Sequence, residues 1–155
     1  MTKPKATAEE LPPAHPYTLA RVQELWYALQ ARSWLSLAIV PSHPGSGSRE
    51  LARALTEVGS ALRGEPVHLF DAEHSDSDAV VKLMVDVRAY TRDNERVVIA
   101  LDPPVINPTA ISLIRAADAA LLTIERGRAD LRSARKTIEL VGPDRLVGSV
   151  LVQAR

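Results

Sequence analysis

The residues best suited to chemistry lie in one glycine-containing segment, Ser42-His-Pro-Gly-Ser-Gly-Ser-Arg49. Phosphate-binding loops of the pattern G-x-x-x-x-G-K-[ST] surround phosphates with backbone N–H groups. Their lysine reaches the β- and γ-phosphates, and their hydroxyl holds Mg²⁺. Aligned on Gly47, this segment has Ser48 in place of the lysine and Arg49 in place of the hydroxyl residue. It therefore predicts the backbone of an anion site without the two side chains that phosphoryl transfer requires.

Two carboxylates follow apolar runs elsewhere in the chain and complete the candidate site. Asp71 ends one run, and Asp102 comes directly after Leu101 at the end of another. We predict a degenerate nucleotide site, weak or inactive, made of Gly45, Ser46, Gly47, Ser48, Arg49, Asp71 and Asp102. No catalytic residue is assigned. No metal site is predicted either, because the four histidines have no ligand spacing.

Hydrophobic periodicity predicts the elements that position these residues. Short apolar runs predict strands at 34–40, 67–71, 96–105, 119–124 and 146–152. Apolar residues at helical spacing predict helices at 18–31, 48–62, 75–91, 108–117 and 131–141. Strands that alternate with helices predict an α/β fold. We expect a doubly wound, mostly parallel five-stranded sheet with helices on both faces.

Composition indicates a single folded domain. The chain has 155 residues, of which 46% are apolar, enough for one core. Residues 1–16 lack apolar periodicity and are predicted to be a disordered tail, which leaves the domain at 17–155. The 19 acidic and 19 basic residues balance, so no overall charge favours nucleic acid. The absence of cysteine and of an apolar signal segment favours a cytoplasmic location.

Five segments in the same order resemble the bacterial tyrosine kinases of exopolysaccharide synthesis, within the MinD/ParA-like P-loop ATPases. Those proteins share a helix before the first strand, P-G-x-G-K-S, L-x-D-x-D, D-T-P-P-V and A-D-x-x-L-L-V-x-R-x-G-x-T. The counterparts here are Ala20 to Leu29, Pro44 to Arg49, Leu69 to Glu73, Leu101 to Val105, and Ala117 to Ala129. The resemblance implies a P-loop NTPase-like fold over residues 18 to 152.

Departures from the family pattern indicate a degenerate and shortened member. Leu101 stands where the family has the acid that positions Mg²⁺, and Asp102 replaces it only if the strand end is rearranged. The chain between Asp71 and the next strand is shorter than is usual in the family. Its tyrosines are scattered, whereas the family has a C-terminal cluster that it phosphorylates. Catalysis and self-phosphorylation are therefore not expected.

The resemblance implies a non-catalytic pseudo-kinase or pseudo-ATPase that acts as a protein-binding regulatory component of bacterial exopolysaccharide synthesis and export. Its implied partner is the cytoplasmic segment of a membrane polysaccharide co-polymerase or chain-length protein, which would recruit it to the inner membrane. Self-association is a further expectation, and no cofactor is expected. Two alternatives stay open. One is a small ATPase or tyrosine kinase that uses ATP and Mg²⁺ at an unorthodox site. The other is a ParA-like positioning protein.

Overall fold

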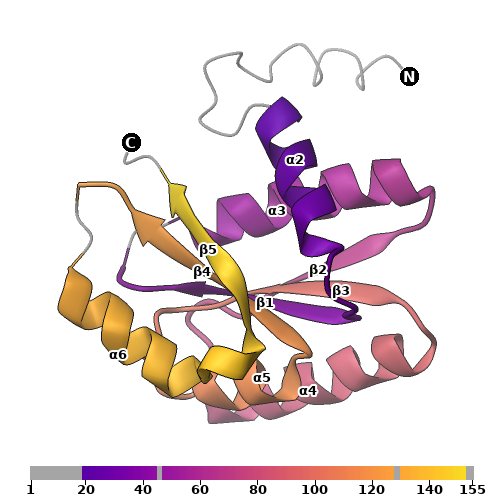
Figure 1. Cartoon of the computed structure of the whole chain (residues 1–155). Helices are drawn as coiled ribbons and strands as arrows, with labels where there is room; N and C mark the ends of the chain where they lie inside the picture. Colours follow the sequence, from indigo (N-terminus) through magenta and orange to yellow (C-terminus); the bar gives the residue numbers. More distant parts are fainter. Residues whose placement is uncertain (1–18, 45–46, 128–129, 153–155) are drawn as a thin grey trace, which may run out of the picture.

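The computed structural model describes residues 19–44, 47–127 and 130–152. The predicted tail at 1–16 lies outside these residues. Strands and helices alternate along the described chain (Figure 1). The strands are β1 (Ser36–Pro41), β2 (Val67–Asp71), β3 (Arg96–Ala100), β4 (Ala119–Glu125) and β5 (Leu146–Val152). The helices are α2 (Leu19–Leu29), α3 (Ser48–Arg63), α4 (Ser77–Arg92), α5 (Ala110–Ala116) and α6 (Leu131–Val141), followed by the 3-10 turn η1 (Pro143–Arg145).

The five strands form one parallel sheet in the order β2-β3-β1-β4-β5. The chain starts at the central strand β1, builds one side through β2 and β3, and then crosses to the other side for β4 and β5. Helices α2 and α3 cover one face of the sheet, and α4, α5 and α6 cover the other (Figure 1). The predicted doubly wound α/β fold with helices on both faces is confirmed, and the sheet is parallel throughout.

Alternate side chains of the central strands supply two separate cores, as expected for a sheet buried on both faces. Leu37 and Ile39 of β1 point toward α2 and α3, whereas Ala38 and Val40 point toward α4, α5 and α6. All four are fully buried. This alternation fixes the register of β1, because a shift by one residue would exchange the two faces.

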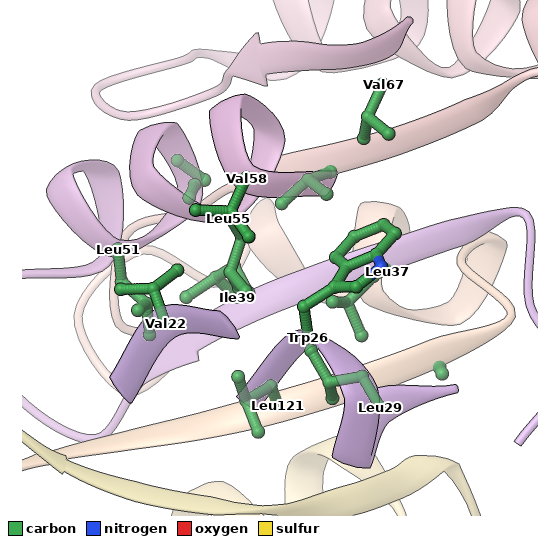
Figure 2. Packing of buried hydrophobic residues seen from close by; sticks show 14 of the residues in the cluster. Val22, Trp26, Leu29, Leu37, Ile39, Leu51, Leu55, Val58, Val67 and Leu121 are labelled. Atoms are coloured by element: carbon green, nitrogen blue, oxygen red, sulfur yellow. The ribbon is translucent and has the colours of Figure 1, made fainter. Parts of the chain in front are cut away.

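The core under α2 and α3 is organised around Trp26 (Figure 2). Its ring meets Trp34 edge to face, with 5.8 Å between ring centroids, and both rings are buried. Trp34 also donates its indole N–H to the carbonyl oxygen of Leu29 at 3.0 Å. On the other side, the Trp26 ring lies directly against Gly59 of α3. The absence of a side chain at Gly59 therefore allows α2 to pack closely on α3.

Several element ends follow the local signals of the sequence. Asp76 caps α4 by accepting a hydrogen bond from the Ala79 backbone N–H at 2.9 Å. Gly142 ends α6, and Pro143 starts the following 3-10 turn. The predicted strand at 96–105 is too long, because pairing ends at Ala100 before the Pro103-Pro104 pair. Within the described part of the chain, no helix has the length and apolar character needed to cross a membrane.

Candidate functional site

The described residues of the predicted site lie at the carboxyl ends of β1, β2 and β3, beside the start of α3. Helix α3 follows β1 on one face of the sheet, while α5 follows the neighbouring strand β3 on the other face. Open α/β sheets bind ligands at such a switch point, where connections leave adjacent strands in opposite directions. A cleft of about 380 Å³ occupies this position. Its lining residues are Pro41, Pro44, Gly47, Ser48, Glu73, His74, Leu101, Asp102, Pro103 and Ile106.

Gly47 and Ser48 connect the loop to α3. Gly47 has φ of 74° and ψ of 26°, a left-handed conformation that a side chain would strain. Ser48 is the first residue of the helix and is 2% exposed. Its hydroxyl lies 3.0 Å from the Leu101 carbonyl oxygen and 3.4 Å from Glu73 Oε2. The hydroxyl therefore joins the start of α3 to the segments that follow β3 and β2. Gly45 and Ser46 of the predicted site lie outside the described residues.

Arg49 is paired with two carboxylates, one at the end of β2 and one in the loop that follows it. Its Nε lies 3.3 Å from Asp71 Oδ2, and its Nη1 lies 3.8 Å from Glu73 Oε1. Half of the Arg49 side chain is exposed, so these ion pairs are screened by solvent. Arg49 and Asp71, both assigned to the predicted nucleotide site, thus lie in contact with each other. Their charges, however, neutralise each other.

Asp102 is held by the surrounding loops. Its Oδ2 accepts hydrogen bonds from the His74 backbone N–H at 2.8 Å and from the Asn107 amide at 2.9 Å. The preceding Leu101 is 1% exposed and packs with the core under α4 and α5. Leu101 and Asp102 therefore lie in different environments just beyond the end of β3. Asp102 lines the cleft, and its carboxylate also orders the β2 and β3 loops.

Glu73 is the functional candidate that the sequence prediction missed. It belongs to the Leu69-Phe-Asp-Ala-Glu73 segment, so the family motif contained the signal, but Asp71 alone was assigned to the site. Burial raises the pKa of Glu73, and the nearby Asp71 and Asp102 carboxylates raise it further. The Arg49 guanidinium and the Ser48 hydroxyl oppose this shift in pKa. Carboxylates crowd this end of the cleft, and Arg49 relieves only part of their repulsion.

The charge of the cleft is unfavourable for phosphate. Its described lining contains the carboxylates Glu73 and Asp102 but no lysine or arginine. Arg49 adjoins the cleft and is already paired with carboxylates. Within the described ranges, no group of three or more histidine or acidic residues has a geometry suited to a metal ion. The arrangement therefore resembles a nucleotide cleft in position but lacks its usual charges.

Comparisons with known proteins support the fold. No protein-family model matches the chain, and no curated protein matches it. Among solved structures, the chimerical protein CapA2B2 superposes with a TM-score of 0.72 at 13% identity, covering 96% of this chain and 88% of that one. The kinase domain of the Escherichia coli tyrosine kinase ETK gives 0.70 at 12% identity, with 88% and 76% covered.

The BceF tyrosine kinase domain gives a TM-score of 0.62 at 16% identity, covering 97% of this chain and 87% of that one. These matches extend over nearly the whole chain and include the elements around the cleft. Identities of this size establish the fold and leave the activity to be argued from the residues. The expected resemblance is confirmed at the level of the fold: the chain has the fold of bacterial tyrosine kinase domains.

Proposed function

We propose that this chain is a non-catalytic, kinase-like protein that acts as a protein-binding regulatory component of bacterial exopolysaccharide synthesis and export. The observation that carries the proposal is the charge of the cleft. Ser48 and Arg49 replace the two residues that handle phosphate and Mg²⁺, and both side chains are held by internal contacts. Phosphoryl transfer depends on cations placed around the transferred group. Here carboxylates stand in that region instead.

The biological process and the partner come from the family resemblance and are part of the proposal. A cytoplasmic segment of a membrane polysaccharide co-polymerase is the partner that this resemblance suggests. Recruitment by that segment would bring the chain to the inner membrane. Fold similarity to tyrosine kinase domains supports this choice of process, while the altered residues at positions 48, 49 and 101 support a role without catalysis.

Titration with nucleotide tests the loss of catalysis. The full chain is titrated with ATP and with ADP, each with and without Mg²⁺, and its melting temperature is measured in the same solutions. A ligand present at 100 times its Kd stabilises the folded state by about 2.7 kcal/mol. We expect no heat of binding, no shift in melting temperature and no hydrolysis. Mg²⁺-dependent binding with turnover would overturn the proposal.

The second part of the proposal is tested by binding to the partner segment. The cytoplasmic segment of a co-polymerase encoded beside this chain is titrated into the purified protein. We expect saturable binding that is unchanged by ATP and Mg²⁺. If the folded protein binds neither nucleotide nor any such segment, the proposed regulatory role is wrong even though the absence of catalysis stands.

The alternative of an unorthodox nucleotide site retains one supporting observation, the position of the cleft at the switch point of the sheet. Under this alternative Arg49 would leave its carboxylates and contact phosphate, while Asp71 or Asp102 would hold Mg²⁺. The variant Asp71→Ala distinguishes this alternative from our proposal. It abolishes nucleotide binding under the alternative, whereas under our proposal there is no nucleotide binding to lose.

A further inference from the structure

One exposed side of helix α4 carries a row of residues that does not line the nucleotide-like cleft. Positions 78, 81, 85 and 88 are separated by three, four and three residues, which places them on one side of the helix. Val81 and Val85 in the middle of this stripe are 61% and 58% exposed. The opposite side of α4 packs on the sheet through the buried residues Val80 and Val87. The stripe of Asp78, Val81, Val85 and Arg88 is therefore an apolar centre with a charge at each end.

The charges at the two ends of this α4 stripe are opposite in sign. Asp78 and Arg88 are both exposed. Neither of them takes part in an ion pair or side-chain hydrogen bond within the described ranges. An acidic side chain in the first turn of a helix interacts favourably with the helix dipole. The position of Asp78 is therefore explained without a binding partner. Arg88 lies a full turn before the helix end, where the dipole contributes little.

An antiparallel second copy of α4 matches this stripe residue by residue. The alternating spacing of three and four is that of a coiled-coil seam. When two such helices run in opposite directions about a two-fold axis, Val81 of one copy lies opposite Val85 of the other. In the same register Asp78 lies opposite Arg88, and the symmetry repeats both pairings. A parallel pair would instead bring Asp78 against Asp78 and Arg88 against Arg88.

We propose that α4 mediates self-association of this chain through an isologous, antiparallel contact between two copies of this stripe. The contact joins two valine pairs at its centre and one Asp78–Arg88 pair at each end. Stable complexes bury about 1,200–2,000 Å² in total. A single pair of short helices buries less, so the dimer forms reversibly and its population depends on protein concentration. The cleft lies at the carboxyl ends of the strands and is not part of this contact.

Exchange of charges between two variants tests this arrangement. Sedimentation equilibrium is measured over a concentration series for the wild-type chain, Asp78→Arg, Arg88→Asp and an equimolar mixture of the two variants. Each variant alone places like charges at both ends of the contact, and we expect dimerisation to weaken at least about 10-fold. In the mixture every end again joins an arginine to an aspartate. We therefore expect association to return to near the wild-type level.

Asp86→Lys is the matched control, because Asp86 is also exposed on α4 but lies outside the stripe. It should leave association unchanged. Melting curves verify that each variant is folded, as expected for exposed positions. A monomeric wild-type chain at all concentrations would refute the proposal. So would single variants that dimerise as well as the wild type, or a mixture of folded variants that stays monomeric.

Discussion

A methyl group added at Gly59 tests the packing between α2 and α3. In Gly59→Ala the new Cβ would lie 2.5 Å from both Cη2 and Cζ3 of Trp26 and 2.9 Å from its Cε3. The Trp26 ring is 2% exposed and also packs against Trp34, so it has little room to move. Overpacking of this kind costs about 1–3 kcal/mol. Alanine within a helix recovers about 0.8–1 kcal/mol relative to glycine.

Contacts as short as 2.5 Å place the overpacking cost near the upper end of its range. We therefore expect Gly59→Ala to lower the free energy of unfolding by about 1–2 kcal/mol. For a domain of this size, the melting temperature falls by about 2–4 °C per kcal/mol. The expected decrease is thus about 2–8 °C, which a thermal melt monitored by circular dichroism resolves easily. Urea unfolding gives the free energy independently.

A second background isolates the steric cause. Trp26→Phe removes the part of the indole ring that the new methyl group would meet, although this change is itself destabilising. In that background we expect Gly59→Ala to be neutral or stabilising by up to about 1 kcal/mol, because only the helix preference remains. If Gly59→Ala destabilises both backgrounds equally, the contact with Trp26 is not the reason for the glycine.

Three further predictions concern charged groups. Because the pKa of Glu73 is raised in the folded state, stability should fall as pH rises through the range above its ordinary value of 4.5. Glu73→Gln should remove that dependence and stabilise the protein at neutral pH, as urea unfolding between pH 4 and pH 8 would reveal. Arg49→Ser should change stability by about 1 kcal/mol or less in the same assay, since its ion pairs are exposed. The Arg96 guanidinium lies 4.6 Å from the Trp34 ring centroid. Arg96→Met should therefore destabilise the folded protein by about 1 kcal/mol in thermal melts. The control Arg92→Met, at an exposed position, should have little effect.

The sequence predicted the fold well because the relevant signals are local. Five apolar runs and five helical periodicities determine an alternating pattern, and the rules for parallel sheets restrict its topology. The end of β3 was misplaced because Leu101 continues the apolar run although pairing stops at Ala100. Burial of Leu101 under α4 and α5 explains its apolar character, but a sequence alone does not separate a buried loop residue from a strand residue.

The candidate site was predictable in its location and only partly in its contacts. The sequence placed Ser48, Arg49, Asp71 and Asp102 at one end of the sheet, since parallel strands end on the same side. The involvement of Glu73 depends on the path of the β2 loop, which turns back through a left-handed residue at His74 with φ of 63°. The Asp102 hydrogen bond to the His74 N–H depends on the same turn. The family motif L-x-D-x-D includes position 73, but residue spacing alone indicates neither of these two contacts.

Arg49 stands where the P-loop pattern has its hydroxyl residue, and it affects the charge of the cleft. Asp71, Glu73 and Asp102 lie close together at one end of the cleft, where burial first and then the two neighbouring carboxylates raise the pKa of Glu73. In a phosphoryl-transfer site, a bound cation offsets such crowding. Here the Arg49 guanidinium does so from within the chain, at 3.3 Å from Asp71. A cation that is part of the protein needs no nucleotide to retain it, and this supports the proposed function without catalysis.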